Sequence, residues 1–338
     1  MLYSINMSIK AINWALAGTG KICGEFISGL RAAGGNAAVV VSRNMEKAKE
    51  FAARNGIDKF YDDYNKMLND SDIDAVYIGT VHTSHHDLTV RALKAKKAVL
   101  CEKPSAINSG QLEEMILTAR NNNVFFMEAM WTRFTPALVK VRSWLSEGLI
   151  GDVKMVQANF GYNAFFDPEN RLFNLHLGGG ALLDAGIYPL SLISMVFNGK
   201  RPADIKSQLS FGKSGVDEQG VIILSYGEHK LAVAASANRT AMANDVWIYG
   251  SQGKIHIPYF VWGRSAKLLI DGKDEYFYQP EFISNGYNYE AQEVMNCIRE
   301  GKIESPVMSW NESLILMETM DTVRSQWNFR YPCEEDDF

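Results

Sequence analysis

Between residues 11 and 129 the chain alternates short apolar runs with segments of helical periodicity, and this alternation limits the folds open to it. The runs are "AINWALAG" (11–18), "AAVVVS" (37–42), "DAVYIGT" (74–80), "KAVLCE" (97–102) and "VFFMEAM" (124–130). Short apolar runs separated by helices are typical of parallel strands that are buried on both faces. We therefore expect a doubly wound α/β domain over residues 1–130.

The pattern changes after Trp131. A helix near 136–147 precedes longer strand-like runs, which are connected by turn signals and not by helices. These runs are "VKMVQANFGY" (153–162), "DIKSQLSF" (204–211), "GVIILSY" (220–226) and "KLAVAASAN" (230–238). Consecutive strands without crossovers pair antiparallel, so residues 131–338 are expected to form an α+β domain with a largely antiparallel open sheet.

One face of this second sheet should be covered by the apolar helix that follows residues 178–180. Two further helices, near 289–299 and 310–324, are expected to end the chain. The other face of the sheet is left open, and mixed-apolar strands such as 230–238 suit contact between two sheets. We therefore expect a homodimer through the open face.

Composition excludes several classes of function. Of the 338 residues 22% are charged, and the net charge of −5 is spread along the chain, so no basic surface for nucleic acid or anionic membrane is expected. No apolar run approaches the ~18 residues of a membrane span. The four cysteines lack CxxC spacing, which favours a reduced, cytoplasmic protein without disulfides.

The first apolar run ends in a glycine-rich turn, "AGTGKICG" (17–24). At a strand-to-helix turn, missing side chains let the backbone approach a pyrophosphate at the helix N-terminus. Cys23 stands where the usual fingerprint has its third glycine. A plain tight turn is the alternative. The turn predicts a dinucleotide site of the Rossmann type, whose phosphate-binding residues would be Gly18, Thr19, Gly20, Lys21 and Ile22.

The second run ends in "VVVSRN" (39–44). A site for NAD would normally place Asp or Glu here to bind the ribose 2′-hydroxyl. Ser42 and Arg43 instead offer a hydroxyl and a guanidinium, which can pair with a 2′-phosphate. A solvent-facing arginine is the alternative. These residues predict NADP(H) as the cofactor.

Strand ends of a parallel sheet meet at its ligand-binding edge. Thr80 and Lys103 each follow an apolar run, and Pro104 stiffens the backbone that carries Lys103. We expect Thr80, Glu102 and Lys103 to face the nicotinamide end of the cofactor. An ordinary surface lysine is the alternative for Lys103.

The apolar segment "LGGGALLDAGIYPL" (177–190) carries two polar residues four apart, Asp184 and Tyr188, which should share one helix face. A buried Asp–Tyr hydrogen bond is one interpretation. The other is catalytic: Lys103 would lower the pKa of Tyr188, which exchanges a proton with substrate, while Asp184 orients the pair. Lys103 itself as the direct base remains open.

Four segments together resemble a known family: "EKP" (102–104), "WTRFTPA" (131–137), "LGGGALLDAGIYPLSLISMVF" (177–197) and "GVDEQG" (215–220). The chain is similar to the glucose-fructose oxidoreductase/inositol dehydrogenase (Gfo/Idh/MocA) family, and within it to the branch of dimeric dihydrodiol dehydrogenase and NADP-dependent D-xylose dehydrogenase. The resemblance implies catalytic roles for Lys103, Asp184 and Tyr188, a role for His85 at the cofactor, and a dimer.

Other residues near these motifs are candidates of less specific kinds. His82 is expected to line the cleft with His85, and no metal is expected, because hydride transfer needs none. Trp131 and Arg133 either border the cleft and clamp cofactor or substrate, or Trp131 packs between domains and Arg133 forms a structural pair. Asn170 and Arg171 could reach a substrate hydroxyl, and the loops 162–176 and 238–264 should shape the substrate site.

These observations predict an NADP-dependent dehydrogenase that acts on a secondary hydroxyl of a sugar or a vicinal diol, such as a D-xylose-like aldose or a trans-dihydrodiol. Two alternatives stay open. One is a sugar-sensing regulator that binds NADP(H) without turnover, and the other is a reductase of a keto-sugar or dicarbonyl.

Overall fold

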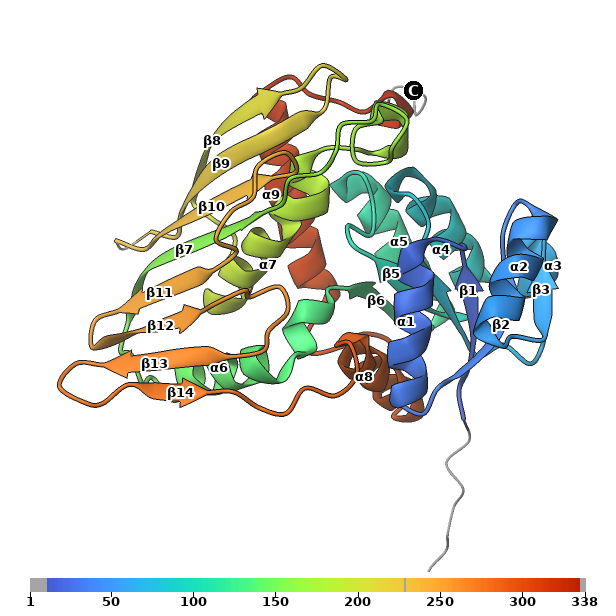
Figure 1. Cartoon of the computed structure of the whole chain (residues 1–338), viewed down its shortest axis with the longest axis horizontal. Helices are drawn as coiled ribbons and strands as arrows, with labels where there is room; N and C mark the ends of the chain where they lie inside the picture. The colour runs from blue at the N-terminus through green and yellow to red at the C-terminus, as the bar shows by residue number, and fades with distance from the viewer. Residues whose placement is uncertain (1–10, 228, 335–338) are drawn as a thin grey trace, which may run out of the picture.

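The computed structural model describes residues 11–227 and 229–334, and these form two sheets with helices between them (Figure 1). Residues 1–10, for which no signal peptide is expected, lie outside the described residues, so this expectation stays a prediction. The first sheet is six-stranded and parallel, with the order β3-β2-β1-β4-β5-β6. Its strands are β1 (Asn13–Ala17), β2 (Asn36–Val41), β3 (Lys59–Tyr61), β4 (Ala75–Ile78), β5 (Ala98–Glu102) and β6 (Phe126–Ala129). Between them lie α1 (Lys21–Ala32), α2 (Met45–Asn55), α3 (Tyr64–Leu68), α4 (His85–Lys94) and α5 (Ser109–Asn122).

This sheet confirms the predicted doubly wound α/β fold. Its strand order reverses between β1 and β4, and the chain segments that leave the carboxyl ends of the strands at such a point form a ligand-binding crevice. Local sequence sets the helix ends: the Asn44 side chain accepts a hydrogen bond from Lys47 N (3.0 Å), and Gly56 ends α2 in the left-handed conformation.

The second sheet has eight strands in the order β14-β13-β12-β11-β7-β10-β9-β8. They are β7 (Val153–Gly161), β8 (Asp204–Phe211), β9 (Asp217–Ser225), β10 (Leu231–Ala237), β11 (Val246–Gly250), β12 (Gly253–Ile257), β13 (Ala266–Ile270) and β14 (Tyr276–Tyr278). Its neighbouring strands are antiparallel with one exception, since β7 and β10 run parallel. The predicted apolar helix separates β7 from the β8–β10 meander, and a crossover of this kind permits the parallel pairing of β7 with β10.

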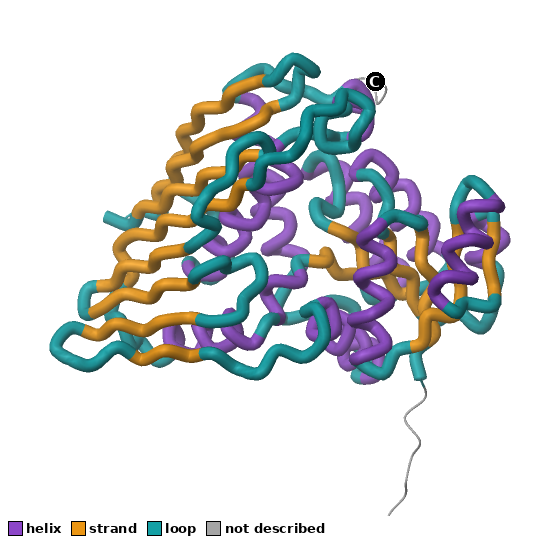
Figure 2. The backbone as a smooth tube through the Cα atoms, in the orientation of Figure 1, coloured by secondary structure: helices purple, strands orange, loops and turns teal. Residues whose placement is uncertain are grey.

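Helices cover one face of this second sheet. They include α6 (Pro136–Ser146), the π-helical turn η4 (Leu182–Gly186), α7 (Ile187–Val196) and α9 (Trp310–Ser325). The predicted apolar helix, formed by η4 and α7, contacts β7 and β10. Figure 2 shows the helices between the two sheets, whereas no helix lies over the opposite face of the second sheet in the part of the chain that the structure describes.

The end of the chain returns to the first sheet. Helix α8 (Tyr287–Arg299) packs against α1, and α9 packs against α5. The backbone of Phe126 in β6 donates to Ile303 O (3.0 Å) and accepts a hydrogen bond from Trp310 Nε1 (2.9 Å). The domain boundary between residues 130 and 131 stays a prediction. Helix α9 contacts both α5, beside the first sheet, and β8 of the second sheet.

One helical stretch among the described residues, Leu175–Val196, is long and apolar enough to cross a membrane. Its most apolar window is 94% buried inside the protein. The stretch packs against β7 and β10, as a core helix does. A core helix is as apolar as a helix that spans a membrane.

Candidate active site

A cavity of about 1620 Å³ opens at the carboxyl edge of the first sheet and is closed on one side by the second sheet's loops and by α8. It brings together most of the residues that the sequence singled out. These are Gly18, Thr19, Gly20, Lys21, Ile22, Ser42, Arg43, Thr80, His82, His85, Glu102, Lys103, Trp131, Arg171, Asp184 and Tyr188.

The glycine-rich turn shapes one wall of this cavity. Gly18 has a φ of +118°, and a Cβ on it would lie 2.8 Å from the carbonyl oxygen of Gly79, so a side chain there is excluded. A Cβ on Gly20 would meet nothing within 4 Å, which leaves space for a ligand. Helix α1 starts at Lys21 with no side-chain cap and no acidic residue in its first turn. These features fit a dinucleotide pyrophosphate.

Cys23, which replaces the third fingerprint glycine, does not line the cavity. It is buried, and its Sγ donates to Gly79 O (3.6 Å). Burial raises the pKa of the thiol to about 12. The side chain therefore fills space between the ends of β1 and β4 and leaves the phosphate-binding wall free.

Ser42 and Arg43 line the cavity where β2 ends. Lys47, one helical turn after Arg43, lines it as well and was missed by the sequence analysis. Asp62 and Asp63 reach the same end, and Asp63 is engaged as the N-cap of α3. Two cations thus stand where a carboxylate would bind a ribose 2′-hydroxyl.

Lys103, Asp184 and Tyr188 meet near the middle of the cavity. Lys103 Nζ donates a hydrogen bond to the backbone carbonyl of Asp184 (2.7 Å) and lies 3.5 Å from Asp184 Oδ1. The same ammonium lies 4.5 Å from the centre of the Tyr188 ring. The side chain of Lys103 therefore reaches from the end of β5 in the first sheet to η4 and α7, the helical segment that covers the second sheet.

The Asp184 carboxylate has two further partners. Arg171 Nη1 donates to Oδ1 (2.9 Å), and the Tyr162 hydroxyl donates to Oδ2. Burial raises the pKa of Asp184, but the positive charges of Lys103 and Arg171 lower it more, and the net pKa lies well below its usual range. Burial lowers the pKa of Lys103, but Asp184, Tyr188 and Glu102 together raise it more, so the net pKa is raised. Lys103 is therefore an ammonium and Asp184 a carboxylate.

The expected lowering of the Tyr188 pKa is wrong. Tyr188 is 8% exposed, and burial raises its pKa more than Lys103 lowers it. The ammonium lies over the ring, while the hydroxyl accepts a weak hydrogen bond from Trp131 Nε1 (3.3 Å). Tyr188 is therefore a neutral phenol here.

Both predicted histidines line the cavity, and both hold backbone segments. His85 Nδ1 lies 2.8 Å from Pro104 O, and its Nε2 lies 3.2 Å from Thr80 O. His82 Nδ1 lies 2.8 Å from Gly178 O, so it joins the segment after β4 to the segment before η4. Burial lowers the pKa of His82 to about 3 and that of His85 to about 4, so both are neutral at pH 7.

Two predicted residues lie outside the cavity, which corrects their expected roles. Arg133 is buried, and its guanidinium donates to the Ser191 side chain (2.8 Å) and to Glu312 (2.6 Å). It therefore stabilises the packing of α7 on α9, as the alternative interpretation held. Asn170 is exposed, and its Oδ1 accepts a hydrogen bond from Leu172 N (3.0 Å) within its own loop.

Several aromatic lining residues were not singled out by the sequence. They are Phe160, Tyr162, Trp262 and Tyr287. Tyr162 and Trp262 lie in the two loops expected to shape the substrate site, while Tyr287 comes from α8, far along the chain. The Tyr287 ring lies 5.0 Å from that of Trp131. The signal for Tyr162 was its place directly after an apolar strand, as for Lys103.

Known proteins are similar to this chain in sequence and in fold. Residues 12–130 match the family described as "Oxidoreductase family, NAD-binding Rossmann fold", and residues 138–256 match the GFO/IDH/MocA C-terminal domain. A trans-1,2-dihydrobenzene-1,2-diol dehydrogenase of Xenopus laevis is 39% identical over 332 residues, covering 95% of this chain and 100% of the relative.

Two solved structures show the same fold at low identity. One is a levoglucosan dehydrogenase in complex with NADH and levoglucosan, with a TM-score of 0.85, 19% identity and coverage of 94% and 97%. The other is a 3-ketoreductase of Actinomadura kijaniata in complex with NADP and TDP-benzene, with a TM-score of 0.81, 22% identity and coverage of 94% and 98%. Together with the glycine turn and the crossing lysine, the two matched domains identify the chain as a member of the Gfo/Idh/MocA oxidoreductase family.

Proposed function

We propose that the protein transfers hydride between NADP(H) and a secondary hydroxyl or carbonyl carbon of a vicinal diol or sugar. The observation that carries this proposal is the meeting of Lys103, Asp184 and Tyr188 in one cavity with the glycine turn. A bound nicotinamide would supply the hydride acceptor or donor. The protein's part is then to move one proton and to hold the substrate oxygen.

Tyr188 is the residue that we assign to proton exchange with the substrate oxygen. Its neutral phenol can donate to a forming alkoxide in reduction, and in oxidation it must first lose its own proton. Lys103, kept charged by Asp184, would stabilise negative charge on either oxygen. Lys103 as the direct base is the alternative, and its raised pKa speaks against it.

The preference for NADP(H) over NAD(H) rests on Arg43 and Lys47, which line the cavity beyond β2. A guanidinium and an ammonium favour a 2′-phosphate, while the lack of a carboxylate at Ser42 or Arg43 removes the usual partner of the 2′-hydroxyl. The fold itself accommodates either cofactor, since the two similar structures contain NADH and NADP.

The aromatic walls favour a cyclic diol as substrate. Trp131, Tyr287, Phe160 and Trp262 can pack against the flat carbon face of a ring, while Arg171 and Tyr162 lie beside Asp184 to bind hydroxyls. A trans-dihydrodiol fits this description and agrees with the name of the relative at 39% identity. An aldose is the second candidate, because the polar side of the cavity suits its hydroxyls.

The open face of the second sheet is the proposed dimer interface. Val221 and Ile223 on β9 and Leu231 on β10 are between 44% and 47% exposed on this sheet. Apolar residues in such a group favour contact with a second copy. Size-exclusion chromatography that gives a monomer at micromolar concentration would contradict the dimer.

The expected cytoplasmic location stays a prediction.

The function is tested by following NADPH absorbance with trans-dihydrodiols, aldoses and polyols, each with NADP⁺ and with NAD⁺. We expect turnover of a dihydrodiol or aldose with a preference for NADP⁺. Reduction of keto-sugars and dicarbonyls is measured with NADPH, which separates the reductase alternative. NADPH binding by fluorescence without any turnover would support the sensor and overturn the proposal.

A further inference from the structure

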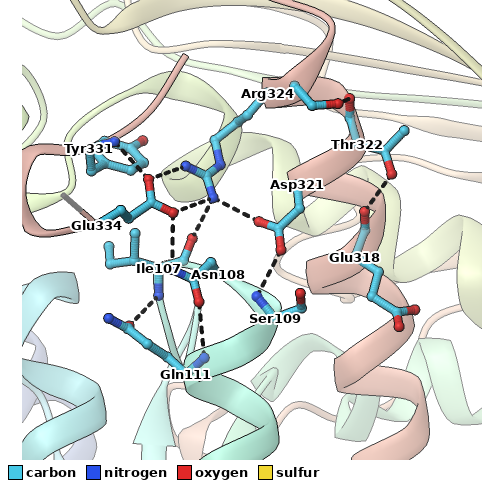
Figure 3. A network of polar contacts seen from close by, with 11 residues as sticks. Ile107, Asn108, Ser109, Gln111, Glu318, Asp321, Thr322, Arg324, Tyr331 and Glu334 are labelled. Atoms are coloured by element: carbon cyan, nitrogen blue, oxygen red, sulfur yellow. Dashed lines mark hydrogen bonds and ion pairs between the residues drawn. The ribbon is translucent and has the colours of Figure 1, made fainter. Parts of the chain in front are cut away.

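The last turn of α9 and the segment after it form a polar network around the buried side chains of Arg324 and Tyr331. We name it the C-terminal clasp (Asp321, Arg324, Tyr331 and Glu334). Arg324 is 4% exposed and donates to both oxygens of Glu334, at 2.6 and 3.0 Å (Figure 3). It also donates to Asp321 Oδ1 (2.7 Å). Its members do not line the cavity, yet the paired charges fix this segment against α9.

The clasp holds the segment that follows Lys103. Arg324 Nη2 donates to Ile107 O (3.1 Å), and Ser109 N donates to Asp321 Oδ2 (2.8 Å). Asn108 Nδ2 donates to Glu334 Oε1 (3.0 Å), while its Oδ1 caps α5. Figure 3 shows these bonds converging on one turn. Ile107 is four residues from Lys103, so the clasp fixes the far end of the lysine-bearing loop.

The clasp also holds the segment that precedes Asp184. The Tyr331 hydroxyl donates to Gly179 O (2.8 Å), and the Tyr331 ring lies 5.3 Å from the Arg324 guanidinium. Gly180, next in the chain, has a φ of +125°, and a Cβ on it would lie 2.3 Å from Asp217 Oδ1.

Asp217 completes this anchorage from β9. It is 1% exposed, and its Oδ2 accepts a hydrogen bond from Leu182 N (2.6 Å), the first residue of the turn that carries Asp184. The two held segments also touch each other, because Ile107 Cδ1 would lie 2.8 Å from a Cβ placed on Gly178.

We propose that the C-terminal clasp is a positioning device that sets Lys103 relative to Asp184 and Tyr188. Lys103 and Asp184 come from parts of the chain that are 81 residues apart, so their relative position depends on contacts between these parts. A displacement of about 1 Å between reacting groups can cost about 100-fold in rate. The clasp bonds both loops at once, so weakening it should move the two catalytic segments apart without touching the cofactor-binding turn. This inference rests on the proposed function.

The test compares Tyr331→Phe with Thr319→Val. Tyr331→Phe removes only the bond to Gly179. Thr319→Val also removes a buried hydroxyl-to-backbone bond, to Ile315 O (2.7 Å), from the same helix α9 but away from the clasp. Activity is expressed per NADPH-binding site measured by fluorescence. We expect Tyr331→Phe to lower kcat per site about 10-fold, with the Kd for NADPH unchanged within about twofold, and Thr319→Val to lower neither.

A second readout is independent of turnover. Hydrogen exchange followed by mass spectrometry should show faster exchange in 103–109 and 178–188 for Tyr331→Phe than for Thr319→Val. Equal kcat per site and equal exchange in the two variants would overturn the clasp. If the wild type turns over no substrate, the proposed function fails, and the exchange comparison alone decides the clasp. Glu334→Gln serves as a stronger variant of the same kind.

Discussion

Replacement of Tyr188 by Phe tests the central chemical assignment. The change removes one hydroxyl and keeps the ring that packs under Lys103 and against Phe160. If Tyr188 exchanges the substrate proton, kcat should fall about 10²- to 10⁴-fold, which corresponds to about 3–5 kcal/mol in the activation free energy. The structural cost is small, because among the described residues the hydroxyl makes one hydrogen bond, the 3.3 Å contact from Trp131.

The assay is steady-state turnover with saturating cofactor, together with NADPH binding by fluorescence. Tyr226→Phe is the matched control, because Tyr226 stacks on Phe197 outside the cavity. We expect the control to keep wild-type kcat and Tyr188→Phe to bind NADPH with unchanged affinity. A Tyr188→Phe enzyme that retains more than about a tenth of wild-type kcat would refute the assignment and favour Lys103 as the direct base.

Three further predictions follow from charges and burial. Arg43→Ala should raise the KM for NADP⁺ about 10- to 100-fold and leave the KM for NAD⁺ unchanged, because it removes a hydrogen bond to a charged group. Equal effects on the KM values of both cofactors would contradict a contact of Arg43 with the 2′-phosphate. Because burial raises the pKa of Tyr188, oxidation by the wild type should accelerate from neutral to alkaline pH, and a flat profile of kcat would contradict this. Burial raises the pKa of Asp217 from 3.8 to about 6, although Arg324 lowers it and the Leu182 and Ala181 amides face it. Folding therefore disfavours the ionised form. The free energy of unfolding of the wild type relative to Asp217→Asn, measured in urea, should fall by about 2 kcal/mol between pH 4 and 7. A constant difference would show that Asp217 titrates normally.

Local sequence patterns predicted the fold and the central residues of the site, because both depend on residues that are near one another in the sequence. Alternating apolar runs specify the parallel sheet, and a residue that directly follows such a run must lie at its ligand-binding edge. Lys103 and Thr80 were found in this way. Asp184 and Tyr188 stood out as polar residues on an apolar helix, which need partners or a cavity.

Features that depend on distant partners escaped the sequence. Arg133 stands beside Trp131 in a cleft motif, but its partner Glu312 is 179 residues away in α9. The Tyr188 pKa depends on how deeply the phenol is buried, which residue spacing does not show. Strands β11 to β14 were not predicted, because they are short and their partly exposed positions mix charged and aromatic residues. Tyr287 reaches the cavity only because α8 returns to α1.

The most direct test of the account follows the hydride itself. A trans-1,2-dihydrodiol deuterated at its carbinol carbons is incubated with NADP⁺ and the protein, and the reduced cofactor is analysed by mass spectrometry. We predict one deuterium in each NADPH formed, with no deuterium transfer by Tyr188→Phe above about a hundredth of the wild-type rate. NADPH without deuterium, or equal transfer by the two proteins, would contradict hydride transfer at the site of Lys103, Asp184 and Tyr188.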